Sequence, residues 1–144
     1  MITKKLGAGM LGLFLAAAVV SGGATVVQAA TSSSSVGYHT SGGVQYFNRA
    51  DVDNTNKRAA TTTGRADNAV MASGRAGSQG RLFLSSGTLC TQGAMTYNNG
   101  GTFAQGRTST TCGPQAHYSY GVSNSWNGSG YDAWYTYRSP SLNF

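Results

Sequence analysis

The sequence predicts a single all-β domain, a small antiparallel β-sandwich of about six to eight short strands closed by one disulfide. Three observations support this fold class. Thr, Tyr and Val are frequent, whereas helix-forming residues are scarce and glutamate is absent. The runs that resemble strands are separated by turns rich in glycine. The chain also has two cysteines, enough for one bridge.

The first segment, residues 1–29, has the pattern of a secretory signal peptide. Lys4 and Lys5 precede an apolar run that is shorter than the about 20 residues a membrane span needs. Val27 and Ala29 are the small residues that a signal peptidase reads, so cleavage is expected after Ala29 or Ala30. We therefore expect a secreted, extracellular bacterial protein without a membrane span after cleavage, the alternative being a retained N-terminal anchor.

Residues 30–42 include the low-complexity stretch "ATSSSSVG" and are predicted to form a flexible polar lead. The remaining residues, 43–144, are predicted to form the β domain. Its strands are expected at 44–48, in a segment that ends at Thr63, at 69–73 and at 81–86. "NNGG" at 98–101 then favours a hairpin, because Asn and Gly tolerate the positive φ angles of tight turns.

Cys90 and Cys112 are predicted to form a disulfide, which in an exported chain is the usual state of a cysteine pair. The loop-entropy model gives such a bridge roughly 3 kcal/mol of stabilisation. The two positions do not lie directly opposite each other across a two-residue turn at Asn99–Gly100. The bridge therefore requires a longer loop, a bulge or a neighbouring strand. The alternative, a metal site, has only His117 as a nearby third ligand.

An aromatic hairpin is predicted near the C-terminus, with 127–130 ("NGSG") as its loop. In this register Trp126 lies opposite Tyr131, Val122 opposite Tyr135 and Tyr120 opposite Tyr137, all on one side. We expect this aromatic side to face the core, because bulky rings bury the most apolar area in a chain poor in Leu and Ile. The opposite side is polar and carries the remaining residues of the two strands: Ser119, Gly121, Ser123, Ser125, Asp132, Trp134, Thr136 and Arg138.

Two groups of residues are candidates for binding. Trp134 and Trp126 are the aromatic candidates, since an exposed ring can stack on a sugar. The second group is cationic, in a chain with a net charge of +6, and would suit phosphate or carboxylate groups if it formed one patch. It consists of Arg65, Arg75, Arg81, Arg107 and Arg138. A solubilising role is the alternative interpretation of these arginines.

No catalytic motif is present, and the scattered aspartates do not suggest a pair of catalytic carboxylates. We therefore expect a protein that is not an enzyme and has no cofactor and no metal, although His39 and His117 are possible bases. Nucleic acid is not expected as a partner, and the sequence leaves the oligomeric state open.

The sequence thus predicts a secreted, cationic, non-enzymatic β-protein that acts at a cell envelope by binding an anionic polymer or glycan. The first alternative is a carbohydrate-binding or adhesion module that uses exposed aromatic residues. The second is a small secreted inhibitor with its loop at "NNGG". In its composition of an export signal, a small cationic Gly/Ser/Tyr-rich domain and an aromatic hairpin, the chain resembles lactococcin-type β-sandwich bacteriocins. That resemblance implies no residue roles.

Overall fold

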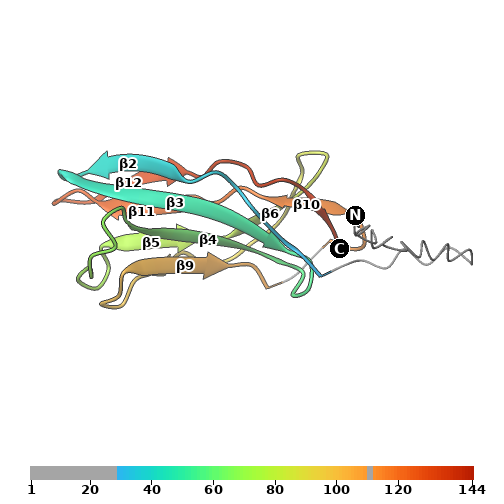
Figure 1. The fold of residues 1–144 in the computed structure, drawn as a ribbon, viewed down its shortest axis with the longest axis horizontal. Coiled ribbons are helices and arrows are strands. Elements are labelled where there is room, and N and C mark those ends of the chain that lie inside the picture. The colour runs from blue at the N-terminus through green and yellow to red at the C-terminus, as the bar shows by residue number, and fades with distance from the viewer. Residues whose placement is uncertain (1–28, 110–111) are drawn as a thin grey trace, which may run out of the picture.

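The computed structural model describes residues 29–109 and 112–144, and in these residues the protein is all-β (Figure 1). The described residues form three antiparallel sheets with no helix, which confirms the predicted fold class. They contain thirteen strands, more than the six to eight expected, because several are pairings of only two or three residues at sheet edges. The predicted signal peptide lies almost wholly outside the described residues.

The first layer of the sandwich is a five-stranded sheet built around a long hairpin of β3 and β4. One side of β3 pairs with two short strands in succession, and β9 pairs with the free side of β4. The strands of this layer are β1 (Thr31–Ser33), β2 (Gly37–Ser41), β3 (Val44–Asp53), β4 (Arg58–Arg65) and β9 (Phe103–Arg107).

The second layer consists of two four-stranded sheets that continue into each other. β5 passes into β6 through Gly80 alone, and β10 passes into β11 through Tyr120 and Gly121. The first sheet contains β12 (Tyr131–Tyr135), β11 (Val122–Trp126), β5 (Ala76–Gln79) and β8 (Thr96–Tyr97). The second contains β13 (Leu142–Asn143), β10 (Ala116–Ser119), β6 (Arg81–Leu84) and β7 (Leu89–Gln92).

The centre of the sandwich is polar, and small residues let the layers approach closely. Asn48 donates to Ser123 Oγ at 2.8 Å and Ser78 donates to Thr63 Oγ1 at 2.7 Å, so hydrogen bonds cross from layer to layer. A Cβ on Gly121 would collide with the Thr61 side chain of the first layer. Close approach and paired hydroxyls thus take the place of bulky side chains at the centre.

Two apolar clusters flank this polar centre, one toward each end of the sandwich. One cluster is formed by Tyr46, Met71, Ala76 and Ala104, with Val44 packed against it. The other is formed by Val52, Ala59, Leu82 and Phe144, with Cys90 and Leu142 packed against it. The inward positions of β3 follow the same order, because Tyr46 and Val52 lie at its two ends and Asn48 between them.

The predicted disulfide is confirmed. Cys90 on β7 bonds to Cys112, with an S–S distance of 2.03 Å and a Cα–Cα distance of 5.8 Å. The bridge therefore ties an edge strand of the second layer to the segment that leads into β10.

The predicted flexible lead, 30–42, is instead part of the first layer. It contains β1 and β2, which together form the edge of the sheet beside β3. Side-chain composition did not reveal this, because backbone groups make the pairing and small hydroxyl residues add to it: Ser34 N donates to Ala50 O at 2.8 Å, and Ser34 Oγ accepts from Ala50 N at 3.0 Å.

Two further predictions, one of a strand and one of a hairpin, are wrong. Residues 69–73 form a loop, in which Met71 enters the core. The start of this loop is held by Asp67, which accepts a hydrogen bond from Ala69 N. The segment 98–101 is no hairpin, because β8 before it pairs with β5 and β9 after it pairs with β4. The same turn residues here carry the chain from one layer to the other, and the buried Asn98 accepts from Ala76 N at 2.9 Å.

The predicted register of the aromatic hairpin is confirmed, with Trp126 opposite Tyr131 and Val122 opposite Tyr135. The prediction of which side faces the core is wrong. Ser123 and Ser125 are fully buried, whereas Tyr135 and Tyr137 are 61% and 60% exposed. The serines face inward because they are small and form hydrogen bonds, as the narrow gap between the layers requires.

Candidate functional site

The candidate site lies where the edge strands β2 and β12 of the two layers meet, which we call the seam. β2 pairs with β3 and β12 with β11, and their inward side chains contact each other across the gap. The ring of His39 stacks on the ring of Trp134, and Ser41 donates a hydrogen bond to Asp132. Figure 1 shows β2 and β12 running together along one side of the molecule.

A hollow of about 380 Å³ opens in the seam, and we call it the aromatic hollow. Tyr38 is 64% exposed and Trp134 is 37% exposed, in addition to the exposed Tyr135 and Tyr137. These rings are accessible to a ligand, which core side chains are not. The hollow is lined by Gly37, Tyr38, His39, Asn48, Tyr120, Trp134, Tyr135, Thr136, Tyr137 and Arg138.

Asn48 provides an unpaired polar atom among the lining residues. Its side chain is 1% exposed, and its Nδ2 donates to Ser123 Oγ and to the Tyr135 carbonyl at 3.3 Å. Its Oδ1 has no hydrogen-bond partner. A buried acceptor without a partner costs about 1–3 kcal/mol. The oxygen itself is covered by its neighbours, so the exposed rings, rather than this atom, are the surface that the hollow presents to a ligand.

Gly37 leaves room for the Asn48 side chain. A Cβ at position 37 would lie 2.5 Å from Asn48 Oδ1 and 3.7 Å from the Tyr137 ring. The absence of a side chain on Gly37 therefore lets the Asn48 amide pack against its register partner on β2.

His39 anchors the seam in its neutral form. It stacks between Tyr46 and Trp134, with ring centroids 5.9 Å and 4.7 Å away, and its Nε2 lies 2.8 Å from Ser125 Oγ. Burial lowers the pKa of His39 to about 4, and the nearby Asp132 only partly opposes this shift. Hydrogen bonds from Ser41 and Asn127 lower the pKa of Asp132, which is therefore ionised at neutral pH.

Ser125, His39 and Asp132 are the residue types of a hydrolase triad, but their arrangement differs. Ser125 is fully buried, so its hydroxyl has no access to a substrate. The described hydrogen bonds of Asp132 come from Ser41 and Asn127. In this geometry the three residues join the two layers at the seam.

The predicted arginines do not form one patch. Three of them lie over aromatic rings as cation–π pairs: Arg138 is 3.6 Å from the Tyr118 ring centroid, Arg81 is 4.9 Å from Phe83, and Arg75 is 5.1 Å from Trp126. Arg65 forms an ion pair with Asp67, and Arg107 donates a hydrogen bond to Gln105.

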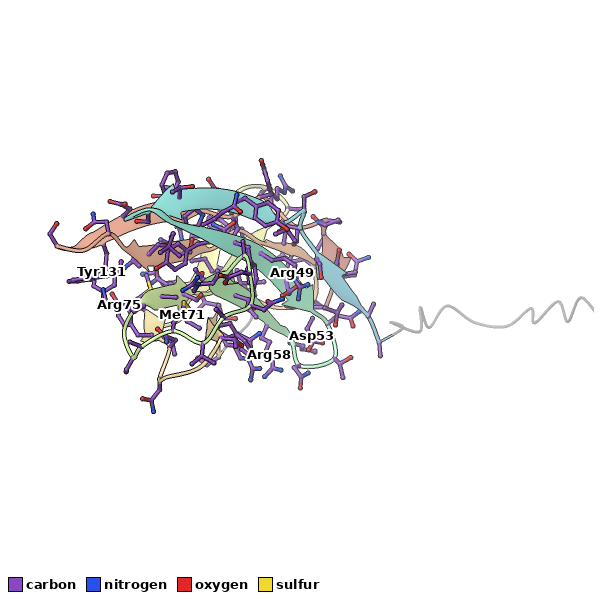
Figure 2. The ribbon with its side chains drawn as sticks, turned by 60° about the vertical axis from the view of Figure 1, so that its left-hand side comes forward. Arg49, Asp53, Arg58, Met71, Arg75 and Tyr131 are labelled. Atoms are coloured by element: carbon purple, nitrogen blue, oxygen red, sulfur yellow. A yellow bond between two sulfur atoms is a disulfide. The ribbon has the colours of Figure 1, made fainter. Side chains whose placement is uncertain are left out.

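The arginines lie in separate regions because they belong to different strands and turns. Figure 2 shows Arg49, Arg58 and Asp53 near each other in one region, and Arg75 with Met71 and Tyr131 in another. Arg107 belongs to the first region, where it lines a small hollow together with Arg49 and Arg58 and with the carboxylates of Asp51 and Asp53.

The structure divides the predicted aromatic candidates between two places. Trp134 and Arg138 line the aromatic hollow. Trp126 lines a second cavity at the end of the sandwich, and Arg65 and Arg75 line the same cavity. Five of the seven predicted candidates thus form two local groups, each with one tryptophan, whereas Arg107 lines the small hollow described above and Arg81 lies over Phe83.

Sequence reasoning missed Tyr38, Asn48 and Tyr137 as site residues. Two of them belong to the β2–β3 hairpin, whose signal is the pair Gly42–Gly43 between two runs that favour strands. Tyr137 lies on the aromatic side that is predicted to face the core, but the size of a ring does not by itself determine its burial. The correct signal on the hairpin was the alternating serines, which the narrow interior accepts.

In the described ranges, no group of three or more potential metal-ligating His, Cys, Asp or Glu side chains comes together. The same residues contain no helix long and apolar enough to cross a membrane. The chain matches no protein-family model, and no curated protein or solved structure is significantly similar to it.

Proposed function

We propose that this protein is a secreted, non-enzymatic binding protein that acts at a cell envelope and recognises a glycan there through the aromatic hollow. The observation that carries the proposal is the set of exposed rings that line one hollow between the two layers. Pyranose rings have apolar faces that stack on such aromatic side chains.

The position of the rings favours glycan recognition over binding by charge alone. Tyr38 and Tyr137 come from opposite layers and line one hollow, which is the geometry of a groove for a chain-like ligand. The arginines, in contrast, are scattered, and Arg49, Arg58 and Arg65 have carboxylate partners. The net charge of +6 then has a supporting role, since it attracts the protein to an anionic envelope.

The two histidines support a binding role over a catalytic one. His39 is buried in the seam, so it has little accessible surface for proton exchange with a substrate. Burial also lowers its pKa to about 4. His117 is fully buried, and its ring stacks on Phe144 with centroids 4.3 Å apart. His39 lines the hollow, but its Nε2 is engaged with the buried Ser125 Oγ, and His117 has no accessible surface from which to act as a general base.

A glycan array of bacterial and host envelope oligosaccharides, followed by titration of the best binder, tests the proposal. Tyr137→Ala should abolish binding, and the matched control Phe103→Ala, which removes a 53% exposed ring on β9, should leave it unchanged. Binding should survive physiological salt, because ring stacking is not screened as charge contacts are. An array without a binder, or equal loss in both variants, contradicts the proposal.

A further inference from the structure

A second cavity, which we call the end pocket, lies at the end of the sandwich and has a volume of about 280 Å³. Three connections surround it: the β2–β3 turn, the loop between β4 and β5, and the β11–β12 turn. Figure 2 shows Met71, Arg75 and Tyr131 grouped in this part of the molecule. The pocket is lined by Gly42, Val44, Tyr46, Arg65, Val70, Met71, Ala72, Arg75, Trp126, Asn127 and Gly128.

Two guanidinium groups line this pocket, and they differ in their partners. Arg65 is held by Asp67, with Nε–Oδ1 at 2.9 Å and Nη2–Oδ2 at 2.5 Å. Arg75 has no ion pair with any carboxylate in the described part of the chain. Asp67 thus offsets the charge of Arg65, whereas the guanidinium group of Arg75 is available to a ligand group with a negative charge.

The local structure keeps Arg75 in place. Trp126 N donates to Arg75 O at 3.0 Å, so Arg75, just before β5, lies beside the last residue of β11. The guanidinium group lies over the indole ring, 5.1 Å from its centroid, and it lines the pocket. A planar guanidinium held in this way suits the two oxygens of a carboxylate.

The rest of the pocket suits a ring-shaped body attached to that carboxylate. Val44 and Met71 form an apolar wall, and Val70 is 68% exposed at the rim. The phenol of Tyr46 is a polar group in this lining, and both arginines act electrostatically on it. The pocket therefore offers a cation, a hydroxyl and an apolar wall to one ligand.

We propose that the end pocket binds the carboxylate of an acidic sugar of the uronic acid type, with Arg75 as the carboxylate-binding residue. The assignment of a sugar as the source of the carboxylate rests on the proposed glycan function. Both cavities lie between the β2–β3 hairpin and the β11–β12 hairpin, so one glycan chain along the seam can reach both. The end pocket would then select acidic glycans among those that stack in the aromatic hollow.

The two tryptophans of the chain permit a direct test, because Trp126 lies in the end pocket and Trp134 in the aromatic hollow. Their indole N–H signals are followed by NMR while glucuronate or galacturonate is added to the ¹⁵N-labelled secreted protein. We expect the Trp126 signal to shift saturably, and Arg75→Gln to weaken this binding about tenfold, as expected from the loss of one charge-assisted contact. Arg107→Gln is the matched control and should bind as the wild type does.

Further titrations distinguish a uronate site from other ligands and from no site. An unmoved Trp126 signal, or equal affinity in Arg75→Gln and the wild type, overturns the site. Inorganic phosphate that binds as tightly as the uronate overturns the carboxylate assignment, and a short peptide that binds only through its free C-terminal carboxylate overturns the sugar assignment. Neutral oligosaccharides should shift the signal of Trp134 alone. If they shift neither signal, the proposed glycan function is contradicted, whereas the response of Trp126 to uronate still decides whether the end pocket binds a carboxylate.

Discussion

The Trp134 indole stacks on the His39 imidazole across the seam, with ring centroids 4.7 Å apart and ring planes inclined by 23°. Trp134 belongs to the second layer and His39 to the first, so this pair joins the two edge strands that form the aromatic hollow. The same imidazole lies 2.8 Å from Ser125 Oγ, deep in the interior. The proposed binding surface and the stability of the seam are therefore coupled through one titratable ring.

Stability should fall as the pH is lowered from neutral toward 4. The unfolded chain has a His39 of ordinary pKa 6.5, whereas the folded pKa is about 4, so the unfolded state binds more protons between these values. The contribution of His39 is fully present above the unfolded pKa. It decreases by at most about 1.4 kcal/mol for each pH unit as the pH falls through the window.

Urea denaturation at several pH values measures this effect, and the His39→Gln variant supplies the control. Glutamine does not titrate, so the variant should start less stable because the stack is lost, and should show a flatter profile between pH 6.5 and 4. Parallel profiles for the variant and the wild type would show that another group causes the pH dependence. The C–H signals of His39 should also titrate near pH 4 in the folded protein.

Tyr46→Ala and Tyr137→Ala should differ strongly in stability. Tyr46 is 3% exposed within an apolar cluster, and removing a buried ring costs about 3–5 kcal/mol. Tyr137 lies at the surface, so its removal should cost less than about 1 kcal/mol. Thermal melts compare the two variants, and a large loss in Tyr137→Ala would mean that this ring is part of the core.

Gly121→Ala should destabilise the fold by about 1–3 kcal/mol, because the added methyl group overpacks the gap between the layers. Its nearest neighbours would be the Thr61 side chain and the Gln79 carbonyl. The double variant with Gly121→Ala and Thr61→Gly should lose less stability than the sum of the two single variants, because the colliding side chain is gone. A double-mutant cycle measures this difference. Gly101→Ala is the matched control, since a Cβ there meets nothing within 4 Å.

Removal of the disulfide with the double variant Cys90→Ala, Cys112→Ala should lower the free energy of unfolding by roughly 3 kcal/mol. The loss arises because the bridge restricts the unfolded chain between β7 and the segment before β10. Urea titration of the variant, with Ser86→Ala as an exposed control in the same region, checks this value. An unchanged midpoint would mean that the edge strand β7 contributes little to global stability.

The sequence by itself was sufficient for features that depend on local chemistry. The loop 127–130 and the register from Trp126–Tyr131 to Val122–Tyr135 follow from turn residues that act over a few positions. The pairing of Cys90 with Cys112 follows from their number and from the expected export. The all-β class follows from composition and turn spacing.

The tertiary structure decided which side of the aromatic hairpin faces inward, and with it the candidate site. A strand with rings on one side and serines on the other can bury either side, depending on the surface it packs against. Here Asn48 supplies the hydrogen-bond partner for Ser123, His39 supplies the one for Ser125, and Gly121 allows close contact with Thr61, so the serine side is buried. Asn48 and His39 each lie more than seventy residues along the chain from the serine they contact, and no local sequence pattern contains that information. The rings of Tyr135 and Tyr137 are exposed as a result, and the hollow they help to form exists only because β2, read from sequence as part of a lead, pairs as an edge strand beside β3.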